Sequence, residues 1–241
     1  MAEDSAMQLN LGQHISRQYN AELERLRSQV LRMGGMVEQQ LEQAVAALCA
    51  GDREAAKQVR KGDRRINDLE VEIDADCTQI VARRQPTATD LRLVMGVVKT
   101  ISDLERIGDE AKRIAKMVDP DLAGWLTDDL RRDLEHMGEL AQGMLHDVLD
   151  AFARVDADDA ITVAQRDNRV DDQYDSITRQ LVDRMAKDSG TIPAAIGVLW
   201  AARSLERIGD RSQNIAEYLI HLVRGEDVRH LNLDELLGDT D

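Results

Sequence analysis

The sequence contains few residues that interrupt helices and few aromatic residues. It has three prolines, and aromatic residues make up 2% of its 241 residues. Segments in which apolar and polar residues alternate with period two are scarce, so a β-sheet is not expected. Ala, Leu, Glu, Arg and Gln are abundant, and all are good helix formers. The sequence therefore predicts an all-α fold.

Cysteine, long apolar runs and a secretion signal are also scarce or missing. The two cysteines, Cys49 and Cys77, are isolated and form no C-x-x-C motif, so we expect buried free thiols in a reducing compartment. No apolar run approaches the ~18 residues that a membrane span needs, which predicts no membrane insertion. The polar, acidic start differs from a signal peptide, so a cytoplasmic location is expected.

Positive charge is in deficit, and the formal net charge is -15. Such a field repels nucleic-acid phosphate, which argues against nucleic acid as a partner and favours cations or a basic protein. The sequence has no nucleophile elbow, P-loop or G-x-G-x-x-G motif. Its five histidines form neither H-E-x-x-H nor E-x-x-H, the motif of di-iron carboxylate enzymes. We therefore expect a protein that is not an enzyme.

One six-residue string, Leu-Glu-Arg-Ile-Gly-Asp, occurs twice, at 104–109 and at 205–210. Around these strings, residues 94–118 align without gaps on 195–219, and ten of the positions are identical. Upstream, the offset between equivalent residues is 104 instead of 101, so that Met33-Gly34 aligns with Met137-Gly138. The sequence is therefore an internal duplication, whose second copy is shorter by three residues in a loop.

Each copy is expected to form three long helices. The predicted helices cover about 16–50, 52–84 and 89–118 in the first half, and about 126–153, 156–187 and 193–224 in the second. Asp119-Pro120-Asp121 reads as the linker. Long helices joined by short turns must fold back on one another. We predict two tandem, pseudo-symmetric, up-down-up three-helix bundles at 1–120 and 121–241, the second ending in a short acidic tail.

The repeated string is unusual because it carries two carboxylates one helical turn apart. Glu105 and Asp109, and likewise Glu206 and Asp210, lie at the edge of an apolar stripe that includes Leu104 and Gly108 in the first copy. The glycine removes a side chain beside the carboxylates and allows a close approach to the helix. Arg106, Glu110 and Arg113 are expected to point further outward.

The middle helix of each half carries a second pair of acids with the same spacing, Glu70 with Asp74 and Asp171 with Asp175. Clustered carboxylate oxygens are typical ligands of hard cations. Asn214, one turn after Asp210, could add a neutral oxygen, which its counterpart Arg113 cannot do. The alternative interpretation is that these acids form ordinary helix-surface ion pairs with the neighbouring arginines. Trp125 and Trp200 are interpreted as packing residues.

Six segments together resemble the PhoU family of bacterial phosphate-signalling regulators. They are Met33–Leu41, Arg84–Arg92, His146–Arg154, Gln213–Ala216 and the two Leu-Glu-Arg-Ile-Gly-Asp strings. The resemblance extends over nearly the whole chain. It implies two three-helix bundles and a negative regulator of the phosphate-starvation (Pho) response and of phosphate uptake. Such a regulator is a non-catalytic adaptor.

The resemblance also implies partners and a metal site. The partners are a membrane-bound sensor histidine kinase, the ATPase subunit of the high-affinity phosphate transporter, and a second copy of the chain in a homodimer. Some relatives hold iron, zinc or manganese clusters on paired E(D)-x-x-x-D motifs, although no cofactor is required. The matching residues are Glu105, Asp109, Glu206, Asp210 and Asn214, with Glu70, Asp74, Asp171 and Asp175 opposite. The remaining alternative is a carboxylate-cluster metal-binding protein or metalloenzyme on a helical bundle.

Overall fold

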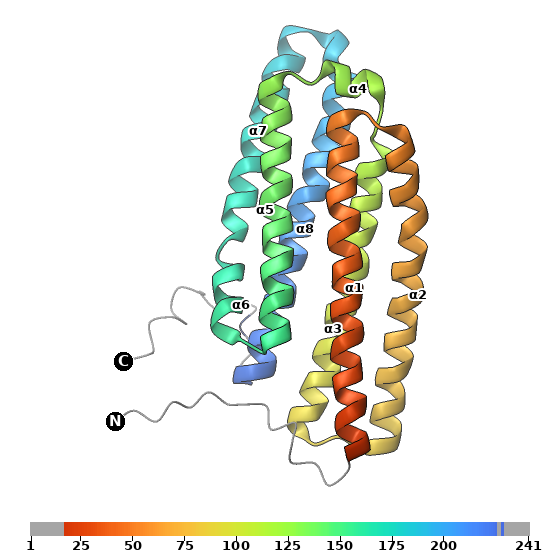
Figure 1. Ribbon diagram of the computed structural model, residues 1–241. Helices are drawn as coiled ribbons and strands as arrows, with labels where there is room; N and C mark the ends of the chain where they lie inside the picture. Colours follow the sequence, from red (N-terminus) through yellow and green to blue (C-terminus); the bar gives the residue numbers. More distant parts are fainter. Residues whose placement is uncertain (1–16, 226–227, 229–241) are drawn as a thin grey trace, which may run out of the picture.

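The computed structural model describes residues 17–225 and residue 228, and the regular secondary structure of this part is all helical (Figure 1). The elements are α1 (Arg17–Ala50), α2 (Arg53–Arg84), α3 (Ala88–Lys116), α4 (Pro120–Trp125), α5 (Asp128–Arg154), α6 (Ala157–Ala164), α7 (Asp167–Lys187), the short 3-10 helix η1 (Ser189–Thr191) and α8 (Ile192–Arg224). No described helix is long and apolar enough to cross a membrane. The predicted all-α fold is confirmed.

Equivalent aspartates begin equivalent helices in the two halves. The carboxylate of Asp52 accepts hydrogen bonds from the backbone N–H groups of the second and third residues after it, and Asp156 does the same at α6. Before α2, Gly51 has a φ of 68°, the left-handed conformation that ends a helix at low cost for glycine. The stop and cap expected at Gly51-Asp52 are therefore confirmed.

The second half departs from the predicted three helices in two places. The helix expected over 156–187 is broken into α6 and α7 at Gln165-Arg166. Four of the five residues Ala160–Ala164 are buried, a wider apolar surface than one stripe of a straight helix presents, and the break lets α6 and α7 face the core at different angles. The predicted linker is in part helical, because Asp119 caps α4 and Pro120 occupies its first turn.

The helices form one elongated body in which the two halves lie side by side (Figure 1). α1, α3, α5 and α8 occupy the middle, with α2 on one side and α6 and α7 on the other. Buried apolar side chains of both halves belong to one continuous cluster. The division into domains at 1–120 and 121–241 remains a prediction, since the halves share this core.

The contact between α3 and α8 repeats itself through the duplication. Oδ1 of Asp103 lies 3.3 Å from Nη1 of Arg211, and Oε2 of Glu110 accepts a 2.8 Å hydrogen bond from the Ser204 hydroxyl. Asp103 is equivalent to Ser204, and Glu110 is equivalent to Arg211. Each half therefore offers the same two positions to the other, as the partners in a two-fold symmetric dimer do.

The contact between α1 and α5 is reciprocal in the same way. A β-carbon added at Gly34 would lie 2.6 Å from Cδ2 of Leu149, and one added at Gly138 would lie 2.9 Å from Cγ1 of Val45. Gly34 is equivalent to Gly138, and Val45 to Leu149. The repeated glycines thus let α1 and α5 cross closely. Both contacts between the halves, α3 with α8 and α1 with α5, therefore use equivalent positions of the two copies.

The interior agrees with the predicted core in most positions. Leu104 and Gly108 are buried as expected, and so are the free thiols of Cys49 and Cys77. The placement of Glu110 on the outside was wrong. Its side chain is buried against α8, where Ser204 and Arg207 supply the hydrogen bonds and the charge that a buried carboxylate requires.

Candidate functional site

The first group of predicted site residues lies between α2 and α3. The pKa of Glu105 is raised above its ordinary value, first by burial and then by the charges of Asp109 and Glu70. Burial also raises the pKa of Glu70, with the neighbouring charges of Asp74 and Asp109 as further causes. The structure therefore brings Glu70, Asp74, Glu105 and Asp109 into one cluster, as the sequence predicts.

A lysine lies inside this first cluster. Nζ of Lys112 is 2.5 Å from Oδ2 of Asp63 and 3.3 Å from Oδ1 of Asp109. The hydrogen bond to Asp63 raises the pKa of Lys112, so its ammonium group stays charged. The other oxygen of Asp63, Oδ1, accepts a hydrogen bond of 3.4 Å from the Gln40 side chain. The most deeply buried acid of the cluster thus has both of its oxygens partnered.

The second cluster lies between α7 and α8. Burial, followed by the charges of Asp171, Asp210 and Glu206, raises the pKa of Asp167 to about 7. Burial and the charge of Asp210 also raise the pKa values of Glu206 and Asp171. Among the described residues, Oδ1 of Asp167 and Oε2 of Glu206 are buried without a hydrogen-bond partner. The deepest acid of this cluster, Asp167, thus differs from Asp63, whose two oxygens both have partners.

The basic side chains do not pair as the surface ion-pair interpretation expected. Arg106 pairs with Asp103, at 3.6 Å, and Arg113 pairs with Glu110, at 2.7 Å. Asp109 pairs with Lys112, and the nearest base to Glu206 is Arg203. Asp109 and Glu206 of the repeated strings therefore do form ion pairs along their own helices, but with Lys112 and Arg203. Arg106 and Arg113 pair with other acids.

The remaining predicted ligands lie at the margins of the clusters. Asp175 is exposed on α7 one turn after Asp171, and Asn214 is half-buried on α8 one turn after Asp210. In the part of the chain that is described, no three His, Cys, Asp or Glu side chains are arranged to hold a metal ion as they stand. Metal binding by the nine predicted residues therefore remains a prediction.

Asp63 and Asp167 are members of the clusters that the sequence prediction missed. They are equivalent residues of the two halves, and their side chains are 3% and 9% exposed. The repeated D-x-R-I/V string that contains them was a usable signal. However, each lies one or two turns before the acid pair of its helix, and only packing shows that they face the same side.

The glycine of the repeated string has a packing function. A β-carbon at Gly209 would lie 2.8 Å from Oδ1 of Asp167, and one at Gly108 would lie 3.2 Å from Oε1 of Gln40. Equivalent glycines thus allow a polar side chain from a neighbouring helix to approach α3 or α8 beside the carboxylates. The sequence predicted that some group would approach the helix closely at these glycines, and in the structure that group is a side chain of the same chain, Gln40 at Gly108 and Asp167 at Gly209.

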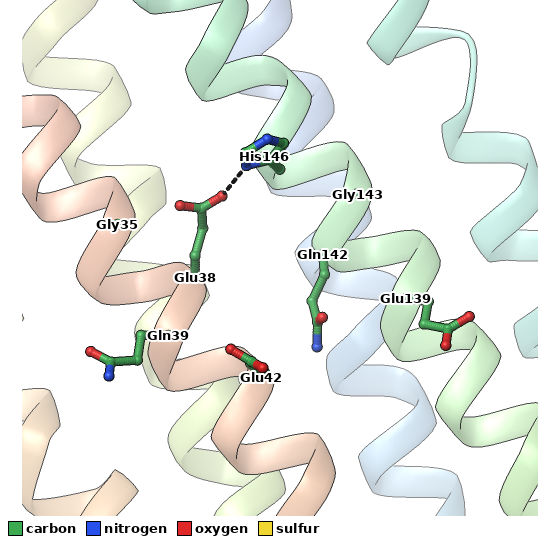
Figure 2. A pocket seen from close by; sticks show the side chains of 8 residues that line it. All are labelled: Gly35, Glu38, Gln39, Glu42, Glu139, Gln142, Gly143 and His146. Atoms are coloured by element: carbon green, nitrogen blue, oxygen red, sulfur yellow. Dashed lines mark hydrogen bonds and ion pairs between the residues drawn. The ribbon is translucent and has the colours of Figure 1, made fainter.

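A separate open groove of about 560 Å³ lies between α1 and α5 (Figure 2). Its lining includes the carboxylates of Glu38, Glu42 and Glu139, and Nδ1 of His146 lies 2.9 Å from Oε1 of Glu38. The hydrogen bond to Glu38 raises the pKa of His146 above its ordinary value. The groove is acidic, and it lies where the two halves meet.

Exposed apolar side chains mark the starts of α3 and α8. They are Leu91 and Met95 on α3, and Ile192, Ile196 and Trp200 on α8. Leu91 is equivalent to Ile192 and Met95 to Ile196. The interpretation of Trp200 as a packing residue was wrong, since 57% of its surface is exposed. Trp125 is partly buried against the core, and the guanidinium of Arg184 lies over its ring.

Two bundles related by duplication, with an acidic cluster at the same place in each, define a two-repeat helical protein of the kind the sequence resembles. The family model described as "PhoU domain" matches residues 30–118 and 134–219. The chain belongs to the PhoU family.

Its relatives cover nearly its full length. It is 52% identical over 228 residues to a protein of Serratia marcescens named "Phosphate-specific transport system accessory protein PhoU", covering 95% of this chain and 93% of that one. The protein of the same name from Escherichia coli is 51% identical, with 95% and 94% covered.

Solved structures agree with the sequence relatives. The crystal structure of PhoU from Pseudomonas aeruginosa matches with a TM-score of 0.83 at 48% identity, covering 87% of this chain and 100% of that chain. A phosphate transport system regulatory protein PhoU from Streptococcus pneumoniae matches with a TM-score of 0.80 at 33% identity, covering 88% and 99%. The two-repeat fold is therefore that of the family.

Proposed function

We propose that this protein is an accessory protein of a phosphate-specific transport system and restrains the phosphate-starvation response when phosphate is plentiful. The observation that carries the proposal is the 52% identity to a protein of that name over 95% of the chain. In this role the chain performs no chemistry of its own. It is an adaptor between the transporter and a sensor histidine kinase, in line with the regulatory and accessory names of its relatives.

Two surfaces are suited to docking the partners. The groove between α1 and α5 presents Glu38, Glu42 and Glu139, which favour a basic partner surface. The exposed apolar side chains at the starts of α3 and α8, Trp200 among them, are the kind of residue enriched in interfaces. The proposed partners are the kinase, the ATPase subunit of the transporter and, in a homodimer, a second copy.

A phosphate-starvation reporter tests the proposal. Cells that lack their own regulator receive this chain, and the reporter is measured in phosphate-rich medium. We expect repression by the unaltered chain, and failure to repress would contradict the proposed role. Two well-folded variants then test the groove and the carboxylate clusters separately: one with Glu42 and Glu139 changed to Gln, the other with Glu105, Asp109, Glu206 and Asp210 changed to Ala.

The partners can be tested directly with purified proteins. Light scattering coupled to gel filtration measures whether the chain is a dimer. Titration calorimetry with the ATPase subunit measures docking, and the Glu42→Gln, Glu139→Gln variant should bind more weakly if the groove is the docking surface. Equal binding by this variant would place the contact elsewhere, for which Trp200→Glu is the next variant.

A further inference from the structure

One face of α3 carries basic side chains along most of its length. Arg92, Lys99, Arg106 and Arg113 follow one another at intervals of seven residues. Seven residues are close to two helical turns, so the four side chains share one face of the helix, over about 32 Å at 1.5 Å per residue. The buried stripe through Leu104 faces the core on the other side. The side chains of Arg106 and Arg113 are 56% and 50% exposed, so this row of positive charge lies at the surface.

Two arginines of α8 lie beside this row and share its acids. Each of the buried carboxylates, Asp103 and Glu110, has one arginine from α3 and one from α8 beside it. The nitrogen-to-oxygen distances are 3.6 Å for Arg106 and 3.3 Å for Arg211 to Asp103, and 2.7 Å for Arg113 and 3.3 Å for Arg207 to Glu110. One arginine would neutralise each acid, so the compensation of buried charge does not account for all four. The row and the two arginines of α8 form the basic strip: Arg92, Lys99, Arg106, Arg113, Arg207 and Arg211.

At the start of α3 the basic strip borders a hollow of about 370 Å³, which lies between α3 and the end of α8. Its lining combines the apolar side chains of Leu91 and Met95 with Lys99 and Tyr218, and none of the described residues that line it is acidic. Nζ of Lys99 lies 5.1 Å from the centre of the Tyr218 ring, and Nε of Arg92 is buried without a hydrogen-bond partner. Within residues 17–225, neither Arg92 nor Lys99 takes part in an ion pair, so both can meet an acid of another protein.

Acidic side chains border the basic strip on both sides. Glu105 and Asp109 lie on the side of α3 that faces α2, and Glu206 and Asp210 lie on the side of α8 that faces α7. The charge of Arg207 reaches Glu206, so the strip is no wider than the two helices that carry it. A broad anionic surface such as a membrane would meet the bordering acids and be repelled. A narrow acidic element would lie between them.

The basic strip lies on the opposite face of the molecule from the acidic groove. α3 packs against α1 and α8, and α5 packs against the same two helices, so the four helices form a square in cross-section. The groove opens between α1 and α5, which face the viewer in Figure 1, whereas α3 and α8 lie behind them. A chain of net charge -15 thus presents one acidic groove and, opposite to it, one basic strip.

We propose that the basic strip docks a single acidic helix of a partner protein. A helix with acidic side chains at intervals of three and four residues along one face matches the spacing of the row and fits between the acids that border it. An apolar side chain of that helix enters the hollow beside Met95, where the exposed Leu91 adds contact. The proposal rests on the adaptor function and deepens it, because the acidic groove and the basic strip then hold partners of opposite charge on opposite faces.

A designed peptide serves as the probe. It is a helical peptide of about 21 residues, long enough to follow the row, and is built from Ala, Gln, Glu and Leu with its glutamates along one face. Its binding to the purified full-length chain is measured by fluorescence anisotropy. We expect binding that weakens as the salt concentration is raised. A version with glutamine in place of each glutamate should not bind.

Variants show whether the peptide binds at the basic strip. Arg92→Gln combined with Lys99→Gln removes two charges of the strip and leaves the ion pairs of the buried acids intact, and it should weaken peptide binding roughly tenfold or more. Met95→Glu, which places an acid in the hollow, should weaken it as well. The matched control is Lys61→Gln combined with Arg64→Gln, which removes two charges from exposed positions of α2 and should leave binding unchanged. Circular dichroism checks that each variant is folded.

The proposal is wrong if the unaltered chain does not bind the glutamate peptide at low salt, or if the double variant of the strip and its control bind the peptide equally well. Vesicles that contain phosphatidylglycerol provide a further arm. If the unaltered chain bound these vesicles through the strip and ignored the peptide, the strip would belong to a membrane contact, and the proposed helix would be excluded.

The phosphate-starvation reporter separates this proposal from the regulatory function. We expect repression by the unaltered chain and a loss of repression in the Arg92→Gln, Lys99→Gln variant. If the unaltered chain did not repress, the regulatory function would be wrong whatever the peptide measurements showed. Repression by both proteins would leave the regulatory function standing and would show that the basic strip does not dock a partner needed for it.

Discussion

Gly138 of α5 lies against Val45 of α1, so close that a β-carbon at Gly138 would be 2.9 Å from Cγ1 of Val45. Valine is stiff at χ1, and its side chain cannot easily turn away. We expect Gly138→Ala to lower the free energy of unfolding by about 1–3 kcal/mol, the usual cost of overpacking a core. Chemical denaturation followed by circular dichroism measures the change.

Gly143 on the same helix is the matched control. Nothing lies within 4 Å of a β-carbon added there. Because alanine is the better helix former, Gly143→Ala should raise stability by roughly 0.5–1 kcal/mol. If the two variants changed stability in the same direction, the close crossing of α1 and α5 would not be what requires the repeated glycine.

Asp103 ties the two halves together. The Tyr218 hydroxyl donates a 2.9 Å hydrogen bond to its Oδ2, and Arg211 lies on its Oδ1. Removing one partner of a buried, charged hydrogen-bond network typically costs about 3–5 kcal/mol. We expect Asp103→Ala to lower the melting temperature strongly.

The control for this network is Tyr218→Phe, which removes one hydrogen bond and leaves the ion pair with Arg211. Its cost should be about 0.5–1.5 kcal/mol, that of a single hydrogen bond. If Asp103→Ala lowered the free energy of unfolding no more than Tyr218→Phe does, the buried carboxylate would add no net stability beyond this one hydrogen bond.

His146 should titrate above its ordinary range. The hydrogen bond from its ring to Glu38 raises its pKa (Figure 2). A histidine whose pKa is raised on folding contributes stability that is fully present below its unfolded pKa of about 6.5 and is lost as pH rises through the folded pKa. Histidine NMR titration should give a pKa above 6.5 in the unaltered chain and a lower one in Glu38→Gln. Equal pKa values would show that this contact does not persist in solution.

The two thiols should react slowly in the native protein. Cys49 and Cys77 are 5% and 2% exposed. Burial raises the pKa of Cys49 to about 11 and that of Cys77 to about 12, so little thiolate forms at pH 8. We expect Ellman's reagent to label them at least 100-fold more slowly in buffer than in urea. Ser189→Cys, at an exposed position, supplies a thiol that should react at once, and fast labelling of the native thiols would contradict the packing.

The sequence could predict those features that depend on local pattern. The helix stop at Gly51, the cap at Asp52 and the buried stripe through Leu104 all follow from the residues themselves. The break between α6 and α7 could not be predicted from breaker residues, since neither glycine nor proline is present there. It follows from how much of α6 is buried against other helices, which is a property of the assembled fold.

The site was predictable in part for the same reason. The repeated string identifies Glu105 and Asp109, because an internal copy provides its own comparison. The importance of Lys112 could not be read from its place in the chain, since it lies three residues after Asp109 and looks like a surface ion pair. Only the packing of α2 against α3 shows that it also reaches Asp63.

The reciprocal contact of α3 with α8 also bears on how such a chain can change over time. Its equivalent positions now carry different residues: acids at Asp103 and Glu110 in the first half, Ser204 and Arg211 in the second. A protein assembled from two copies of the first half would bring Glu110 against Asp103 twice, in place of Ser204 against Glu110 and Arg211 against Asp103. The two halves have therefore become complementary at this contact, the first supplying both acids and the second the serine and the arginine that face them.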